Sequence, residues 1–188
     1  MPRNKAYSED IVLEKAMHVF WGKGYEATSL RLLEKEMGIN QFSIYSSFTN
    51  KKNLFLESIR KYREYVSRNV YQSLLGKDAG LAELKAFFME KRENINFRGC
   101  LVVNTAAEVG ARDKSIAKEV NLYYDFIRDM LRNVLLNAKK KGEIPPDVDI
   151  EKYANFFLGV MQGLSIASKT LNEGQIKDFI SIALMKVG

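Results

Sequence analysis

The sequence has few of the residues on which several kinds of site depend. It holds one cysteine and one histidine among 188 residues, which excludes an internal disulfide and leaves no zinc-ligand spacing. A single cysteine suits a reducing cytosol. Only 3 prolines and 12 glycines are present, which favours long helices. We find no strand pattern, internal repeat or low-complexity tract.

Long apolar runs are also missing. No stretch of about 18 apolar residues exists, so we expect no membrane span. The first ten residues lack the apolar run of a secretory signal, and we expect a cytoplasmic protein. Hydrophobic residues still make up 46% of the chain, enough for a real core.

Signatures of catalysis are absent as well. Neither a phosphate-cradling glycine loop nor a nucleophile elbow appears in the sequence. The one histidine, His18, is remote in sequence from the one cysteine, Cys100. We therefore predict that the protein is not an enzyme and has no catalytic residues, no metal site and no cofactor.

Charge alone does not locate a binding surface. The net charge of +6 agrees with a polyanionic partner. The first 60 residues hold 9 Lys and Arg against 7 Asp and Glu, a surplus of only two. A motif has to identify any nucleic-acid-binding part.

Residues 28–48 carry the most informative pattern. Thr28 is a good N-cap for a first helix, and Gly38 stands where that helix needs a left-handed residue to end. A second short helix begins near Asn40. Two short helices joined by a tight turn are the layout of a helix-turn-helix, whose second helix enters the DNA major groove. The positions expected to pack are Leu30, Leu33, Met37, Ile39, Ile44 and Phe48, and the neutral polar ones left over are Asn40, Gln41, Ser43, Ser46 and Ser47.

Helical periodicity continues through the rest of the chain, and the expected fold class is all-α. One helix starts after Ser8 and precedes the motif, with Glu9 and Asp10 in its first turn. The later helices are separated by glycine-rich or proline-containing breaks. Their expected ranges are 51–75, 81–94, 100–110, 113–141, 149–171 and 174–187.

Several short segments together match a known pattern. They are Gly24, Tyr25, Thr28 and Ser29, then residues 37–39, 43–48 and 51–55, and the separate stretch 99–108. In these segments the chain resembles TetR-family transcriptional regulators. The resemblance implies about nine helices, a helix-turn-helix DNA-binding domain at 1–50 and a ligand-binding and dimerisation domain at 51–188. It also implies a homodimer, a small-molecule inducer and, most commonly in the family, repression.

The resemblance also predicts how DNA is held. Thr28, Tyr45 and Lys51 match phosphate-contacting positions, and Ser29 lies beside them. Gln41 is the best candidate for reading a base, because an amide pairs bidentately with adenine. Asn40 and Ser43 are secondary candidates, Phe42 is placed to pack on a thymine methyl, and Arg3 and Lys5 form a basic arm. The family often has Lys, Gly and His at positions 41, 42 and 47, so an operator sequence cannot be transferred from relatives.

The last two helices are expected to carry the dimer face. Residues 153–164 are apolar nearly all round, and such a helix must be covered on every side. The alternative is that this helix is only monomer core. The expected interface residues are Phe157, Gly159, Val160, Gly163, Phe179 and Ile182.

A ligand pocket is expected in the C-terminal domain. Cys100, Asn104 and Glu108 have i, i+4, i+8 spacing and share one helix face, which points either into a site or to water. A buried Glu108 would favour cationic or hydrogen-bonding ligands. Other candidates, of a kind that is more often plain core, are Phe88, Tyr123, Tyr124, Phe156 and Met161.

The predicted function is a ligand-responsive regulator, a repressor that binds a palindromic operator as a homodimer and is released by an inducer. It would act in the cytoplasm at the nucleoid. One alternative is a redox or electrophile sensor of the same fold acting through Cys100, because a helix N-terminus and the nearby Arg98 favour a reactive thiolate. The other is a helical interaction protein that does not bind DNA.

Overall fold

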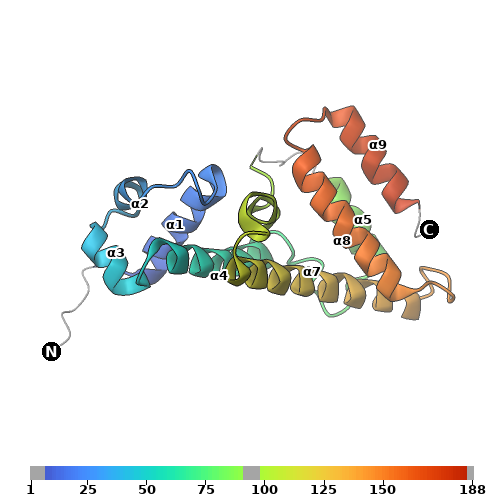
Figure 1. Cartoon of the computed structure of the whole chain (residues 1–188). Helices are drawn as coiled ribbons and strands as arrows, with labels where there is room; N and C mark the ends of the chain where they lie inside the picture. Colours follow the sequence, from blue (N-terminus) through green and yellow to red (C-terminus); the bar gives the residue numbers. More distant parts are fainter. Residues whose placement is uncertain (1–6, 91–97, 186–188) are drawn as a thin grey trace.

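The computed structural model describes residues 7–90 and 98–185, which form nine helices and no strand. The prediction of an all-α chain is confirmed. Figure 1 shows α1, α2 and α3 at one end of an elongated molecule and α8 and α9 at the other. The long helices α4 and α7 run between these two ends. Among the described helices, none is both long and apolar enough to span a bilayer.

The first three helices form a small tri-helical unit. They are α1 (Glu9–Lys23), α2 (Leu30–Met37) and α3 (Gln41–Phe48). The turn between α2 and α3 uses Gly38 in the left-handed region, φ 74°, as the sequence predicts. One face of each helix is buried in a shared core, through Val12, Ala16, Met17, Phe20, Leu33, Met37, Ile44 and Phe48.

Helix α4 (Lys51–Asn69) completes that core and then leaves it. The Phe55 ring centroid lies 4.8 Å from that of Phe20 and 4.7 Å from that of Tyr25. The expected end at residue 75 is wrong, because the helix stops at Asn69. No glycine or proline marks this stop; Tyr71 turns into the core instead, 5% exposed.

The C-terminal helices end close to where the sequence places them. The ranges expected for α7, α8 and α9 agree with the observed ones to within four residues, and that of α5 runs on into residues that the structure does not describe. Helices α7, α8 and α9 each begin at an Asp or Asn N-cap whose side chain accepts a backbone N–H. The four helices are α5 (Leu81–Glu90), α7 (Lys114–Lys140), α8 (Ile150–Ala167) and α9 (Glu173–Leu184).

The helix expected at 100–110 has two parts. Helix α6 (Leu101–Thr105) passes directly into a π-helical segment, η1 (Ala106–Gly110). A π-helix bonds i to i+5 and so has a different angular step from an α-helix. Cys100, Asn104 and Glu108 were expected to share one polar face, but they do not form one. Their partners differ: Tyr123 for Cys100, Arg98 and Lys169 for Asn104, and the backbone at Tyr25 and Glu26 for Glu108.

Candidate nucleic-acid interface

Helix α3 presents an uncharged outer face. Phe42 is 81% exposed and Tyr45 40% exposed, whereas Ile44 is fully buried. Gln41 is also exposed, and its side-chain N–H donates to the Tyr45 hydroxyl at 3.4 Å. An amide, a phenyl ring and a phenol therefore stand on the free side of a helix that is anchored by its other side. Ser43, half-buried, lies at the edge of this face.

Three neighbours hold α3 in place. The Asn40 side-chain oxygen accepts the Ser43 N–H at 2.8 Å, which caps the helix and leaves the Asn40 NH₂ group for other partners. The Tyr7 hydroxyl donates to the Ser43 carbonyl at 3.2 Å and pairs with the Ser47 hydroxyl at 2.9 Å. The Glu34 carboxylate accepts the Gln41 N–H. Sequence reasoning missed both Tyr7 and Glu34. Tyr7 is 36 residues from Ser43, and the Glu34 contact crosses the turn between two helices.

The predicted role of Thr28 is wrong. Ser29 caps α2, with its hydroxyl accepting the Leu32 N–H at 3.2 Å. Thr28 is fully buried, and its hydroxyl donates to the Gly24 carbonyl at 2.6 Å. A side chain with no exposed surface cannot reach a phosphate, so Thr28 is a structural residue. Ser29 is exposed beside it.

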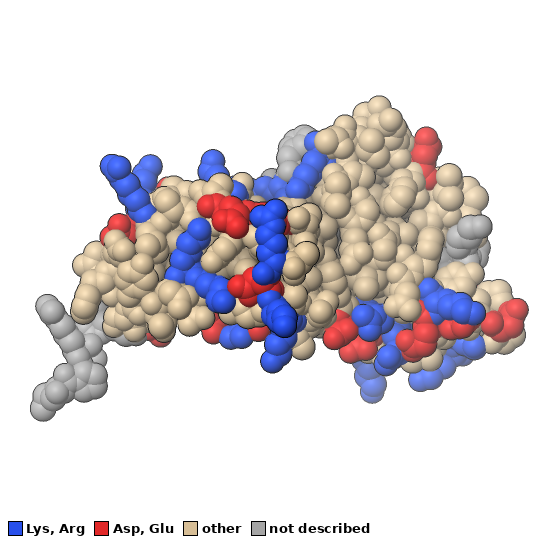
Figure 2. Space-filling view, viewed as in Figure 1, with Lys and Arg blue, Asp and Glu red and all other residues tan. Residues whose placement is uncertain are grey.

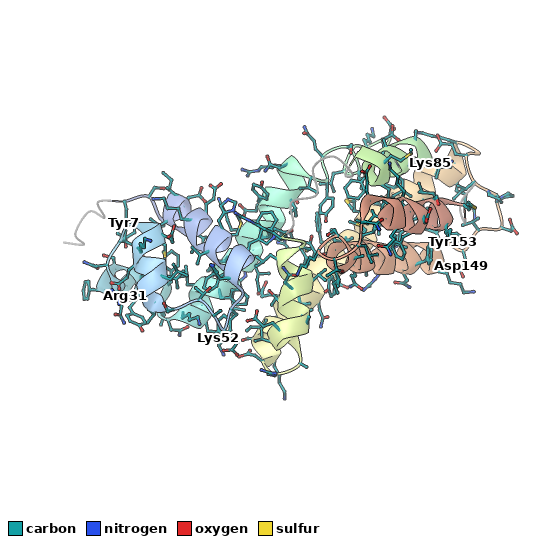
Figure 3. The ribbon with its side chains drawn as sticks, turned by 90° about the horizontal axis from the view of Figure 1, so that it is seen from above. Tyr7, Arg31, Lys52, Lys85, Asp149 and Tyr153 are labelled. Carbon is teal, nitrogen blue, oxygen red and sulfur yellow. The ribbon has the colours of Figure 1, made fainter. Side chains whose placement is uncertain are left out.

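Positive side chains surround this end of the molecule without standing on α3. Lys51 opens α4, and its Nζ lies 4.5 Å from the centre of the Tyr25 ring. Partial burial lowers the pKa of Lys51, while Glu26 and Glu108 act in the opposite direction. Arg31 on α2 is exposed and was not predicted (Figure 3). Arg3 and Lys5 lie outside the described residues.

Glu108 binds the loop between α1 and α2. Its carboxylate accepts the backbone N–H groups of Tyr25 at 3.0 Å and Glu26 at 2.8 Å. Gly24 has φ 81°, and a Cβ built there would lie 2.7 Å from Glu108 Oε2. The prediction that Glu108 faces a ligand pocket is therefore wrong. We call Gly24, Tyr25, Glu26 and Glu108 the loop clamp.

Further contacts join the N-terminal helices to the rest of the chain. The Trp21 indole N–H donates to the Gly99 carbonyl at 2.8 Å. On the other side, Lys52 Nζ lies 3.1 Å from Asp113 Oδ2 (Lys52 is labelled in Figure 3). Hydrogen bonds from Ser115 and Lys52 hold the pKa of Asp113 far below its usual value. Helices α1 and α4, which flank the helix-turn-helix, are thus connected to the two ends of the α6–η1 segment.

A cavity of about 540 Å³ lies between α1, α4 and the C-terminal helices. Five of the residues predicted to bind a ligand line this cavity: Phe88, Cys100, Tyr123, Tyr124 and Met161. Trp21, from α1, also lines it and was not predicted.

Three predicted pocket residues lie elsewhere. Asn104 donates to the Arg98 carbonyl at 2.9 Å and accepts from the Lys169 ammonium, outside the cavity wall. Phe156 is 42% exposed on the outside of α8. Glu108 belongs to the loop clamp. The amphipathic pattern could not settle these orientations, because each depends on partners distant in sequence.

An uncovered apolar face runs over α8 and α9. Phe179 is 40% exposed and Ile182 59% exposed, and Gly159 has open space in front of it. Figure 2 shows few charged side chains over these helices, in contrast to the opposite end, where Lys and Arg project. We call Phe156, Gly159, Phe179 and Ile182 the α8–α9 face.

Two of the other predicted interface residues, Phe157 and Val160, are not on this face. Phe157 is fully buried and Val160 only 5% exposed, so both are core residues. Gly163 serves a contact within the chain: a Cβ there would lie 3.4 Å from the Phe179 ring. The alternative that α8 is monomer core therefore holds for one side of the helix and not for the other.

Two family models match the chain. The model described as "Bacterial regulatory proteins, tetR family" matches residues 12–58. The model described as "Tetracyclin repressor-like, C-terminal domain" matches residues 80–181. The first covers the helix-turn-helix, and the second covers more than half of the whole chain.

The chain belongs to the TetR family.

The sequences of individual relatives match this chain along most of its length. The HTH-type transcriptional repressor ComR of Escherichia coli (strain K12) is 28% identical over 172 residues, which cover 89% of this chain and 82% of ComR. The HTH-type transcriptional regulator YezE of Bacillus subtilis (strain 168) is 28% identical over 190 residues and covers 98% of both chains.

A solved TetR-family structure also matches from end to end. It is a cysteine mutant of the regulator CifR complexed with a 26-base-pair double-strand operator DNA. The TM-score is 0.85 at 26% identity, with 99% of this chain and 100% of that chain covered. The protein is therefore a DNA-binding transcriptional regulator, as the sequence predicts, with an N-terminal helix-turn-helix and a C-terminal helical domain.

Proposed function

We propose that this protein is a ligand-responsive repressor that binds a palindromic operator as a homodimer and is released when a small molecule fills the cavity. The observation that carries the proposal is the exposed, uncharged face of α3, held from behind by Tyr7, Asn40 and Glu34. The names of the relatives support repression, since ComR is a repressor. The protein acts in the cytoplasm at the nucleoid and has no catalytic activity.

The residues of α3 divide into base-reading and phosphate-binding roles. Gln41 pairs with adenine through its amide, and Phe42 packs on a thymine methyl. Asn40 and Ser43 add contacts at the edge of the helix. Phosphates are bound by Ser29, Tyr45 and Lys51, by the exposed Arg31, and by an N-terminal arm containing Arg3 and Lys5. Phosphate contacts supply affinity and base contacts supply sequence preference.

Dimerisation brings a second α3 helix to the same operator. The α8–α9 face leaves large apolar side chains uncovered at the end of the molecule opposite α3. A two-fold axis through this face makes the same patch meet itself, which is how a homodimer closes. Two α3 helices then reach major grooves about 34 Å apart, or a multiple of that distance.

The response to a ligand passes from the cavity to the loop clamp. Trp21 and Cys100 line the cavity. The α6–η1 segment that follows Cys100 carries Glu108, which binds the backbone at Tyr25 and Glu26. A ligand that moves α6 therefore moves the loop in front of α2. A ligand shifts the equilibrium between the DNA-binding conformation and the released one only through its different affinity for the two. A useful coupling free energy between ligand binding and DNA binding is about 1–3 kcal/mol.

Selection from a pool of random duplexes tests the proposal. The protein should enrich an inverted repeat, and the affinity for it should fall steeply as salt rises. Gln41→Ala should weaken binding by about 1–3 kcal/mol, whereas Lys85→Ala, on α5 far from α3, should leave it unchanged. Failure to enrich any sequence would overturn DNA recognition and favour a helical interaction protein.

Cys100 supports a second candidate function, electrophile sensing. It is half-buried, lines the cavity, and its Sγ lies 3.6 Å from the Tyr123 hydroxyl. An electrophile in the cavity therefore meets the only thiol of the chain. Release of DNA by an electrophile should be lost in Cys100→Ser if this function is real. Unchanged release in that variant would remove the candidate.

A further inference from the structure

Among the described residues, the wall of the cavity is largely aromatic and carries no ionic side chain. About 540 Å³ is within the usual size of a small-molecule site. Among the described residues that line it, none is Asp, Glu, Lys, Arg or His. The aromatic members are Trp21, Tyr62, Tyr65, Tyr71, Phe87, Phe88, Tyr123 and Tyr124.

The polar groups of the wall are neutral hydroxyls, amides and a thiol. The Tyr71 and Tyr123 hydroxyls lie 3.1 Å apart, and the Cys100 thiol donates to Tyr123 at 3.6 Å. Burial raises the pKa of Tyr62, Tyr71 and Tyr123, and it raises the pKa of Tyr124 to about 12. These phenols therefore stay protonated at neutral pH and act as neutral hydrogen-bonding groups.

Nearby charged side chains lie outside the wall, and most are bound to other partners. Arg98 is exposed, with its guanidinium carbon 6.0 Å from the centre of the Trp21 ring. Glu108 binds the backbone of the loop clamp. Arg60 and Glu119 bind each other, with 2.6 Å between Nη2 and Oε1. Lys169 donates to Asn104. None of them lines the cavity. An ion transferred into this space would lose its hydration without gaining a counter-charge from these groups, which is strongly unfavourable.

We infer that the cavity takes an uncharged, mainly aromatic compound with a hydroxyl or carbonyl oxygen, and rejects carboxylates and ammonium ions of the same shape. The rings supply flat apolar contact, and the phenols and Gln162 supply hydrogen bonds to the oxygen. The inference rests on the proposed function only in taking this cavity as the inducer site. Binding itself can be measured without DNA.

Three probes of one shape test the inference: phenylbutanol, phenylbutyrate and phenylbutylamine. Trp21 is the only tryptophan in the sequence and lines the cavity, so its fluorescence reports occupancy. Phenylbutanol should change this fluorescence saturably. It should bind at least about tenfold more tightly than either ion, because one uncompensated buried charge costs more than about 1.4 kcal/mol. Equal binding of an ion, or no binding of the alcohol, would overturn the inference.

Two variants at one wall position confirm the location. Gln162 is half-buried on α8 and lines the cavity together with Tyr124, so the isosteric Gln162→Glu fits the same space. This variant should gain phenylbutylamine binding by at least about tenfold, and Gln162→Lys should gain phenylbutyrate binding instead. Circular dichroism checks that both fold. If folded variants keep the preferences of the wild type, the compounds bind elsewhere and the inference fails, whether or not the protein selects an operator.

Discussion

Gly24 and Glu108 explain part of the family pattern in physical terms. Gly24 has positive φ, and the Glu108 carboxylate occupies the space that a Cβ would need. Thr28, four residues on, donates its hydroxyl to the Gly24 carbonyl. The segment from Gly24 to Thr28 thus forms one loop that is held by a carboxylate from the C-terminal domain.

The glycine pair at 22 and 24 gives a matched test of this loop. Gly24→Ala should lower the free energy of unfolding by at least about 1 kcal/mol, because alanine is strained at φ 81° and meets Glu108. Gly22→Ala should raise it by about 0.5–1 kcal/mol, since Gly22 is helical with open space around it. Urea unfolding measures both. Equal stability of the two variants would contradict the loop clamp.

Phe42 is predicted to act in DNA recognition without contributing to stability. Because the ring is 81% exposed, Phe42→Ala should change stability by less than about 0.5 kcal/mol. Replacing thymine by deoxyuridine in the selected operator removes a methyl group, worth about 0.8 kcal/mol or fourfold in affinity for the wild type. Phe42→Ala should bind both duplexes equally in fluorescence anisotropy. A variant still sensitive to the methyl group would exclude Phe42 as its reader.

At the scale of single residues, the sequence predicted some side-chain positions and missed others. The pattern found the packing positions Ile44 and Phe48, because burial follows helical spacing. It placed the N-cap of α2 one residue early, since Thr28 and Ser29 are both competent caps and only the contact with Gly24 separates them. Tyr7 gave no signal, because its partner Ser43 is 36 residues away.

The elements α4 and α7 meet through two charged pairs. Lys52 bonds Asp113, which also caps α7, and Arg60 bonds Glu119. These contacts fix the helix-turn-helix relative to the C-terminal domain. Their strength depends on the charge of the carboxylates.

Acid should weaken the α4–α7 contact through Asp113. Its folded-state pKa is lowered by Ser115 and Lys52, so its contribution is present above the unfolded pKa, about 4, and is lost as pH falls through the folded value. Asp113→Asn keeps a capping residue and removes the charge. The wild type should melt above this variant at neutral pH, and the difference should shrink below about pH 4.

A second asparagine variant controls for the change in net charge. Asp147 is exposed in the loop before α8, and Asp147→Asn should give no such pH-dependent difference from the wild type. If the melting temperatures of Asp113→Asn and Asp147→Asn changed with pH in the same way, the bond between Asp113 and Lys52 would not contribute to stability.

Helix ends were predicted where local residues set them and missed where packing does. Gly38 ends α2, and the caps Asp113, Asp149 and Asn172 begin α7, α8 and α9. The end of α4 lacks such a residue. The change from α6 to η1 also has no signature in the helical periodicity, and Glu108, expected in the pocket, binds the loop before α2 instead.

At the scale of the whole molecule, the α8–α9 face is an apolar surface that a single chain leaves uncovered. Phe179→Glu combined with Ile182→Glu should give monomers in sedimentation velocity, because charges placed in the proposed interface repel their symmetry copies. Leu75→Glu, at a residue 43% exposed in the turn after α4, is the matched control and should stay dimeric. A double variant that remains dimeric would move the interface elsewhere.

The sequence identified this face only in part. Residues 153–164 are apolar almost throughout, so pattern alone could not separate the core side of α8, with Phe157 and Val160, from its uncovered side. That division depends on where α7 and α9 lie. Phe156 was assigned to the pocket and lies outside for the same reason.

The central claim is that two copies of α3 read one operator together. Binding of the dimer to the selected duplex, and to the same duplex with one half-site scrambled, tests it most directly. Two chains should bind the intact duplex, and scrambling should weaken binding by at least about 100-fold, because the second contact is then lost. One chain bound per duplex, with equal affinity for both, would contradict the account.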